Sequence, residues 1–502
     1  MMDLIHNLVF GISVAATVQN IFLCLIGALV GTLIGVLPGL GPVATIAMLL
    51  PITYGLPPVG ALIMLAGIYY GAMYGGSTTA ILVNIPGESA SVVTTLDGHQ
   101  MALQGRAGPA LAIAAIGSFF AGCVATVVIA AAAAPLTSIA LLFGPAEYFS
   151  LMVLGLILAV VLAKGSVVKA VAMILVGLVL SMVGSDLETG AGRLNFNIPE
   201  LADGINFAVV AMGVFGFAEV LRNLEVTHNR DIVSAKISGL LPTREDLKAA
   251  APAIGRGTAL GACLGILPGG GSVIAAFAAY TLEKKLSKTP QRFGRGAIEG
   301  VAGPETANNA ASQTSFIPLL TLGIPPNPVM ALMVGAMTIH GIVPGPQVMT
   351  KQPDLFWGMI ASMWFGNLML LVINLPLVGL WVRLLRVPYR LLYPTILIVC
   401  CIGVYSVNNS PTDVYLTAAF ALVGYWLVKH DFEPAPMLLG FVLGPLMEEN
   451  LRRAMLIARG DWSVFVTRPI SGALLVVSAI LFIIAVLPMI RKKRDEVFVE
   501  EG

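Results

Sequence analysis

The stretch GVLPGLGPVATIAML begins at Gly35 and recurs, little changed, as GILPGGGSVIAAFAA from Gly265. Both copies lie within apolar sequence. Proline removes a backbone donor and glycine permits positive φ, so each phrase should break a helix. Inside a bilayer such a break is tolerated only where it faces protein or a water-filled cavity. The duplication therefore predicts two broken helices at corresponding positions of two repeated units.

The composition is that of a membrane protein. Of 502 residues, 57% are hydrophobic and 11% are charged, whereas soluble domains carry about 25% charged residues. Segments such as LMVLGLILAVVLA from Leu151 do not alternate as barrel strands do. We expect an all-α polytopic membrane protein with two internal repeats and roughly 11–13 transmembrane or re-entrant helices.

Four parts are expected along the chain. A first transmembrane repeat unit covers 1–222, a polar cytoplasmic connector 223–252, a second repeat core 253–350 and C-terminal transmembrane helices 351–502. Arg491 to Arg494 place the C-terminus in the cytoplasm by the positive-inside rule. By the same rule Arg383 and Arg452 fall on opposite faces, unless one pass is miscounted or Glu448 and Glu449 neutralise the second basic cluster.

A polar stretch follows each phrase. GGSTTAILVNIPG (75–87) follows the first and TSFIPLLTLGIPP (314–326) follows the second. Gly/Pro-interrupted helices at matching positions of two repeats point to a transporter's binding site. The half-helices that start near Pro42 and Ser272 should present positive dipole ends to a carboxylate.

Candidate ligands come from the breaks and from the polar stretches. Backbone N–H groups, hydroxyls and amides can bind an organic anion; the substrate candidates are Gly39, Gly41, Ser77, Thr78, Thr79, Asn84, Gly269, Gly271, Ser272, Asn308, Asn309 and Thr314. Carboxylate and hydroxyl oxygens suit a hard cation, so Glu88, Glu305 and Ser312 are the candidates for a coupling cation.

Plainer interpretations stay open for the same residues. Glycine and proline are common in membrane helices, serine and threonine can join helices by hydrogen bonds, and 299–316 could be a solvated loop. His340 could be a structural residue or a proton relay, and Asp97, His99 and Arg106 could form a turn cap or a gate contact. We expect Glu219 and Arg222 to pair locally, and the five cysteines to be small core residues.

Several classes of function are disfavoured. Walker A, H-E-x-x-H and G-x-S-x-G sequences are absent from the chain, so we expect no enzyme and no metal beyond Na⁺. The net charge of +1 disfavours a nucleic-acid partner. An intramembrane enzyme or a structural scaffold remains a second class of explanation.

Seven stretches together resemble one family. They are GVLPGLGP, YGGSTTAILVNIPGE, DGHQMA, GILPGGGS, FGRGAIEGVAGPETANNAA, IPLLTLGIP and HGIVPGP, in this order. Their combination resembles the large membrane subunit of the bacterial tripartite tricarboxylate transporters, the TctA type. The sequence departs from that pattern at Pro326-Asn327-Pro328 and in AASQTSF (310–316), which border the expected cavity.

The resemblance implies a multi-pass subunit of the bacterial inner membrane. It would act by symport, with a small membrane subunit and a periplasmic solute-binding protein. It would import an organic anion, a citrate-like tricarboxylate or a dicarboxylate, driven by Na⁺ or H⁺ and without other cofactors. A stand-alone organic-anion symporter or channel is the alternative within transport.

Overall fold

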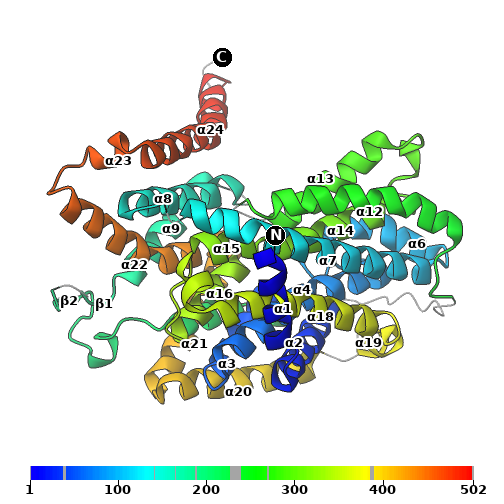
Figure 1. Ribbon diagram of the computed structural model, residues 1–502, viewed down its shortest axis with the longest axis horizontal. Helices are drawn as coiled ribbons and strands as arrows, with labels where there is room; N and C mark the ends of the chain where they lie inside the picture. Colours follow the sequence, from blue (N-terminus) through cyan, green and yellow to red (C-terminus); the bar gives the residue numbers. More distant parts are fainter. Residues whose placement is uncertain are drawn as a thin grey trace.

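The computed structural model describes residues 2–37, 41–140, 142–163, 166–186, 189–225, 239–267, 271–384 and 389–499. The described chain is helical apart from one short antiparallel ribbon, in which β1 (Gly184–Ser185) pairs with β2 (Gly192–Arg193). Figure 1 shows the helices gathered in one body, from which α24 (Pro469–Val499) projects with the C-terminus at its end. This confirms the predicted all-α fold class.

The first repeat is built from α2 (Val18–Val36), α3 (Pro42–Thr53) and α4 (Pro58–Val83). Thr17 caps the start of α2 by accepting from the backbone N–H of Asn20. Prolines begin α3 and α4, where the missing N–H would have had no helical partner. The predicted break therefore lies between α2 and α3, and the prediction that a half-helix starts near Pro42 is confirmed.

The second repeat has the same order, with α12 (Arg244–Leu264), α13 (Gly271–Leu286) and α14 (Glu299–Thr314), followed by α15 (Phe316–Leu322). A helix starts at Gly271, one residue before the predicted Ser272. Thr243 and Asp246 form a capping box at the start of α12. The first turns of α12 are polar and lie in the sequence of the predicted connector 223–252.

Glycines fix the same register in both repeats. A Cβ added at Gly27, Gly31 or Gly35 of α2 would strike the carbonyls of Met64, Ile68 or Ala72 on α4. The same is true of Gly257 and Gly261 of α12 and of Gly265, which caps its C-terminus; their neighbours are the carbonyls of Gly303, Ala307 and Ala311 on α14. Such small-residue faces let membrane helices approach backbone to backbone. The repeat therefore includes the helix before each break.

The two repeats interlock. The helix that follows the first repeat, α7 (Ala107–Ala140), packs on α12 and α14 of the second. Its counterpart α18 (Pro353–Asn374) packs on α2 and α4 of the first, and the two long helices also touch each other. In Figure 1 α12, α13 and α14 lie at the upper right, and α2 and α3 lie at the lower centre.

Shorter elements also make contacts between the two repeats. The half-helix α13 contacts η1 (Ser89–Ser91) of the first repeat, and α3 contacts α16 (Pro328–Ile339) of the second. After η1, the first repeat continues with α5 (Val92–Thr94), η2 (Thr95–His99) and α6 (Gln100–Leu103), and η5 (Pro290–Arg292) lies between α13 and α14 of the second. The remaining elements around the repeats are α1 (Met2–Ala15), α17 (Gln347–Lys351) and α19 (Val378–Leu384).

Further helices pack outside the repeats in two groups. The first group packs around α8 and α22. It comprises α8 (Pro145–Leu162), α9 (Val167–Ser181), α22 (Pro434–Ile457), α23 (Val464–Thr467) and α24. The other lies around α21 and α3: it comprises α10 (Phe207–Ala211), η4 (Met212–Phe217), α11 (Ala218–Glu225), α20 (Tyr389–Asn408) and α21 (Pro411–Lys429). A single turn, η3 (Pro199–Leu201), follows the ribbon.

Six helices in the described ranges are long and apolar enough to cross a bilayer. They lie in α2, α4, α7, α18, α21 and α24. Five shorter apolar helices, in α1, α3, α8, α9 and α16, bring further apolar surface. The multi-pass character is therefore shown, whereas the pass count and the four-part division of the chain stay predictions.

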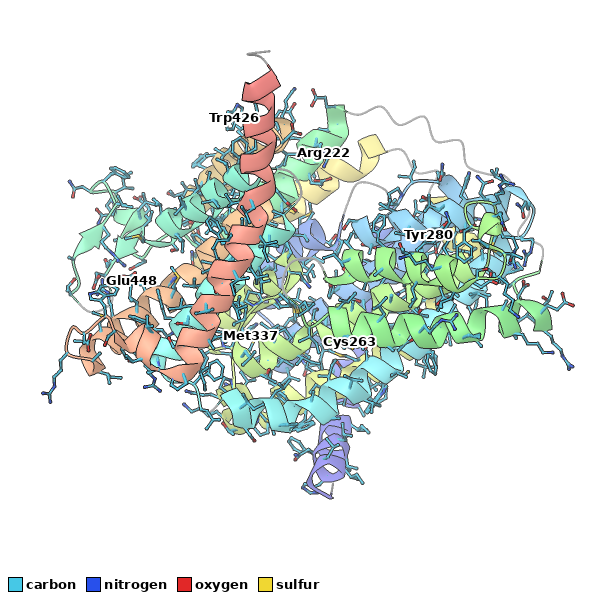
Figure 2. The ribbon with its side chains drawn as sticks, turned by 90° about the horizontal axis from the view of Figure 1, so that it is seen from above. Arg222, Cys263, Tyr280, Met337, Trp426 and Glu448 are labelled. Atoms are coloured by element: carbon cyan, nitrogen blue, oxygen red, sulfur yellow. The ribbon has the colours of Figure 1, made fainter. Side chains whose placement is uncertain are left out.

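Several ion pairs join charged residues outside the two repeats. Glu448 and Glu449 pair with Arg452 and Arg453, at 2.7 Å and 2.5 Å, as one of the two predicted explanations for that basic cluster requires. Arg452 also binds the buried Asp186, which in addition pairs with Arg193 of β2. Figure 2 shows Glu448 at the side of the molecule opposite Tyr280.

Two other sequence predictions have structural outcomes. Glu219 and Arg222 pair within one turn, at 3.9 Å, so this prediction is confirmed. All five cysteines are free, with Cys24 and Cys400 buried. The prediction of a core position is wrong for Cys263, which is exposed, because the outer face of a membrane-protein helix is as apolar as its core.

Candidate functional site

Both polar stretches lie on buried helices. The apolar run of α4 ends near residue 75 in the sequence, but the helix continues to Val83. It includes Ser77, Thr78 and Thr79, which are buried. Every residue of α14 from Gly300 to Thr314 is buried, so the interpretation of 299–316 as a solvated loop is wrong. A helix satisfies its own backbone groups, and its polar side chains must therefore find partners on neighbouring helices.

Glu305 is the centre of the first set of contacts. Its carboxylate is 1% exposed and accepts a hydrogen bond of 2.5 Å from the Ser77 hydroxyl. Its second oxygen accepts from Thr94 on α5. Both donors belong to the first repeat and Glu305 belongs to the second, so the contact joins the two repeats.

Glu88 is the centre of the second set. After the end of α4, the stretch Ile85-Pro86-Gly87 turns the chain so that Glu88 caps η1, with Oε2 accepting from the Ala90 N–H at 2.7 Å. Its Oε1 accepts from the side-chain amide of Asn308 on α14, at 3.1 Å. This contact, too, crosses from one repeat to the other.

The repeat contains a counterpart of the Glu88 contact. Asn84 and Gly323 both adopt the left-handed conformation at a helix end, and each is followed by Ile-Pro. In the second repeat this alignment places Asn327 where the first has Glu88. Asn327 also caps a helix, and its amide approaches the Tyr69 hydroxyl at 3.4 Å.

Tyr69 also has polar neighbours from the second repeat. The side chains of Ser272, at the start of α13, and Ser315 lie near its hydroxyl, which is also within electrostatic range of Glu88. The breaks, the two polar stretches and the Ile-Pro turns are thus brought to one region between the repeats.

Several oxygens in this region are buried without a hydrogen-bond partner. They belong to Tyr74, Asn308 and Asn309. Tyr74 lies within electrostatic range of Glu305. Unpaired buried polar atoms are rare in folded proteins and call for a ligand, ion or water. Glu88 and Glu305 likewise have no lysine, arginine or histidine partner among the described residues.

Several of the other predicted ligands have hydrogen-bond partners within the protein. Thr79 donates to the carbonyls of Gly35 and Val36 and so caps the end of α2. Thr314 and Ser312 donate to carbonyls of their own helix, Asn309 donates to Ser118, and Asn84 ends α4. Thr78 is buried on α4, Gly41 precedes α3 and Gly271 begins α13. The predictions for Gly39 and Gly269 lie outside the described residues.

Three residues of the site were not predicted as ligands. Thr94 lies just before DGHQMA and outside the two polar stretches, and Tyr69 stands within an apolar run. Asn327 stands out in the sequence only as a departure from the family pattern. Its signal was available, because the match between 75–87 and 314–326 aligns Asn327 with Glu88 when it is continued by one residue.

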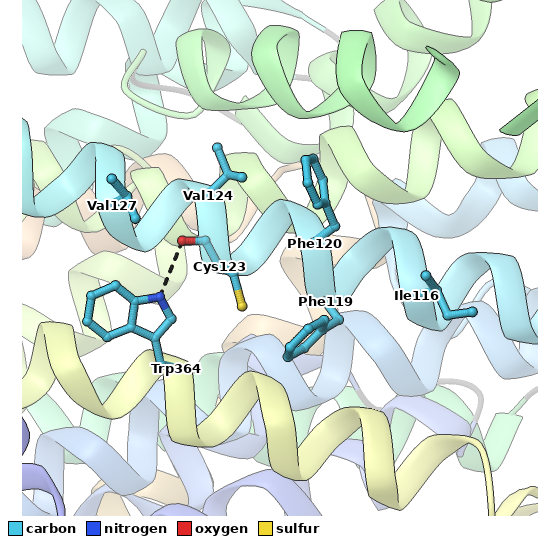
Figure 3. Close-up of a pocket in the computed structure, with 7 residues that line it drawn as sticks. All are labelled: Ile116, Phe119, Phe120, Cys123, Val124, Val127 and Trp364. Atoms are coloured by element: carbon cyan, nitrogen blue, oxygen red, sulfur yellow. Dashed lines mark hydrogen bonds between the residues drawn. The ribbon is translucent and has the colours of Figure 1, made fainter. Parts of the chain in front are cut away.

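An apolar cavity is lined by residues of α7 and α18. It measures about 410 Å³ and is lined by Ile116, Phe119, Phe120, Cys123, Val124, Val127 and Trp364. Figure 3 shows the Trp364 indole donating to the Cys123 carbonyl, at 3.4 Å. Its walls offer almost no polar surface, so it lacks the groups that an organic anion needs.

The chain is thus a multi-pass helical membrane protein in which two broken-helix repeats surround buried polar groups, an arrangement characteristic of transport proteins. It belongs to the tripartite tricarboxylate transporter TctA family, whose model matches residues 21–439.

Two relatives from Agrobacterium vitis are similar to it. An "uncharacterized 52.8 kDa protein in TAR-I ttuC' 3'region" is 60% identical over 501 residues and covers all of both chains. An "uncharacterized protein in TAR-II ttuC' 3'region" is 64% identical over 241 residues, which is 48% of this chain and all of that protein. No solved structure matches this chain.

Proposed function

We propose that this protein is the membrane subunit of a secondary active transporter that imports organic anions of the tri- or dicarboxylate class, driven by a cation gradient. The observation that carries the proposal is the set of buried hydrogen bonds between the repeats. Ser77 meets Glu305, and Asn308 meets Glu88, with no basic side chain to neutralise either acid in the described ranges.

The acids support coupling to a cation. A buried carboxylate without a basic partner is strongly disfavoured in its charged form unless a proton or a metal cation compensates it. Hydroxyl, amide and carboxylate oxygens are also the ligands that a hard cation such as Na⁺ prefers. We assign Glu305 and Glu88 to the coupling cation, Na⁺ or H⁺, with Ser312 on the same helix as Glu305.

The anion would bind beside them. Neutral donors cluster around Tyr69, where Ser272, Ser315 and the Asn327 amide converge near the start of α13. The N-terminus of α13 adds the positive end of its dipole. Substrate would thus contact hydroxyl and amide donors, and the bound cation would offset repulsion from Glu88.

The partners follow from family membership. A tripartite system implies a small membrane subunit and a periplasmic solute-binding protein, in the bacterial inner membrane with the C-terminus in the cytoplasm. The test is uptake of labelled organic acids by vesicles that contain both membrane subunits, with and without the purified binding protein, at varied Na⁺ and pH.

Uptake that needs the binding protein and a cation gradient is expected. Equal uptake without the binding protein would favour a stand-alone symporter or channel. Membership of a transporter family favours transport over intramembrane catalysis.

A further inference from the structure

Asp97 makes the densest set of hydrogen bonds to a carboxylate in the described chain. It lies in η2 and is fully buried. Its Oδ1 accepts from the backbone N–H groups of four successive residues, Gly294, Arg295, Gly296 and Ala297, at 2.9, 3.1, 2.8 and 2.8 Å. Its Oδ2 accepts from the Tyr280 hydroxyl of α13, at 3.0 Å.

The sequence of the loop makes this arrangement possible. Gly294 and Gly296 have φ of +80° and +99°, which other residues adopt only with strain. These glycines turn successive N–H groups toward one point, as in an anion-binding nest. Hydrogen bonds to a carboxylate are stronger than those between neutral groups. The loop between α13 and α14 is therefore held by one side chain of the other repeat.

The same segment that carries Asp97 also touches the site. Thr94, three residues earlier, donates to Glu305. Glu305 lies on α14, which begins directly after the loop that Asp97 binds. Between these two contacts the helices are close: a Cβ added at Gly98 would lie 3.6 Å from Val301, and one added at Gly300 would strike the Asp97 carboxylate. Residues 94–98 thus contact α14 at its start and again at Glu305.

We propose that Asp97 is a positioning residue for Glu305. By anchoring residues 294–297, its carboxylate fixes the start of α14 against η2 and so sets the register in which the Thr94 hydroxyl meets Glu305. The inference rests on the proposed function only in treating Glu305 as the cation-coupling group. The anchoring itself is independent of any substrate.

The anchoring is tested by hydrogen exchange of the full-length protein in lipid nanodiscs. In Asp97→Asn, which keeps the size but removes the charge, the amides of 294–297 should exchange roughly tenfold faster or more, since hydrogen bonds to charged groups are worth about that factor each. Peptides that cover Glu305 should also lose protection. Unchanged protection of either segment would overturn the proposal.

A matched control is Asp246→Asn. Asp246 also caps a helix of the second repeat and binds Arg106, but it does not contact the loop or Glu305. Because Asp246→Asn should lower the stability of the whole fold, it should speed exchange generally, without the selective loss of protection at 294–297 and at Glu305 that Asp97→Asn produces. Equal losses in both variants would mean a general loss of stability and would contradict positioning.

Coupling is measured separately by uptake with the binding protein present. Asp97→Asn should raise the Na⁺ or H⁺ concentration for half-maximal uptake severalfold, with a smaller effect on substrate half-saturation. Normal cation dependence despite a released loop would overturn the proposal. If wild-type uptake depends on no cation, the proposed function fails while the exchange result still reports the anchoring.

A milder variant covers the case in which Asp97→Asn does not fold. Tyr280→Phe removes one of the five hydrogen bonds and keeps the ring. It should produce the same pattern at smaller amplitude, with partial loss of protection at 294–297 and at Glu305. No change in either segment would contradict the proposal.

Discussion

The side-chain amide of Asn308 donates to Glu88 Oε1 at 3.1 Å, and both side chains are buried at the junction of the two repeats. The repeat-related contact joins Asn327 to Tyr69, at 3.4 Å. One contact therefore contains a carboxylate, whereas its counterpart contains only neutral groups. The two halves of the site therefore share a backbone arrangement but differ in charge.

Asn308→Ala should reduce uptake by roughly tenfold or more, because a hydrogen bond to a charged group is worth about 1.5–3 kcal/mol. The amount of protein in the membrane should change little. The measurement is initial uptake rate per folded protein in reconstituted vesicles. Asn408→Ala is the control, since Asn408 is exposed and binds Asp413 away from the site; equal rates for both variants would remove Asn308 from the site.

Ser77→Ala should shift the cation dependence of uptake. The substitution takes a donor from the buried Glu305 carboxylate, and an unpaired buried group costs about 1–3 kcal/mol. The cation titration is compared with that of Thr281→Ala, in which the exposed hydroxyl bonds only to its own helix. If the dependence of uptake on cation concentration is the same in Ser77→Ala as in the wild type, Ser77 takes no part in cation coupling.

Gly261→Ala should destabilise the protein, by about 1–3 kcal/mol as for other overpacked positions. The added Cβ would press on the backbone of Ala307 in α14. Gly255→Ala, two turns earlier on the same helix, meets nothing within 4 Å and should be neutral or slightly stabilising. Thermal unfolding in detergent compares them, and similar midpoints would show that the two helices are not closely packed at Gly261.

Asp246 should contribute stability that disappears in acid. Burial alone would raise its pKa, but hydrogen bonds from Thr243 and the Arg106 guanidinium outweigh burial and hold the pKa below its ordinary value of 3.8. A lowered folded-state pKa stabilises the fold above the unfolded pKa, and this contribution is lost as the pH falls through the folded value.

Asp246→Asn tests this sign. The wild type should unfold at a higher temperature than the variant at neutral pH, and the difference should shrink as the pH falls below about 4. A difference that grows in acid would contradict the expected direction.

The sequence alone predicts the architecture of the repeats well. The duplicated phrase located both half-helix starts, because proline and glycine act on the backbone locally and need no knowledge of the rest of the fold. The pairing of Ser77 with Glu305 could not be predicted from the sequence. It joins residues far apart in the chain and depends on how α4 and α14 cross, which many distributed contacts decide.

Asp97 illustrates the same limit. Its position in DGHQMA marked it as a turn cap or a gate contact, and both interpretations described local roles. The groups that it binds lie in a loop of the other repeat, where two glycines expose backbone N–H groups that no side-chain pattern reveals. Contacts made by backbone N–H groups are hard to predict from the sequence, because every residue except proline has such a group.

That loop also makes the two halves unequal. In the first repeat only 54–57 connect α3 to α4, whereas 287–298 connect α13 to α14. If transport proceeds by the two repeats exchanging conformations, identical halves would give two access states of equal energy. The longer connection, tied down by Asp97, adds hydrogen bonds on one side only. We therefore expect the protein at rest to favour one access state, and substrate or cation to supply the free energy that reaches the other.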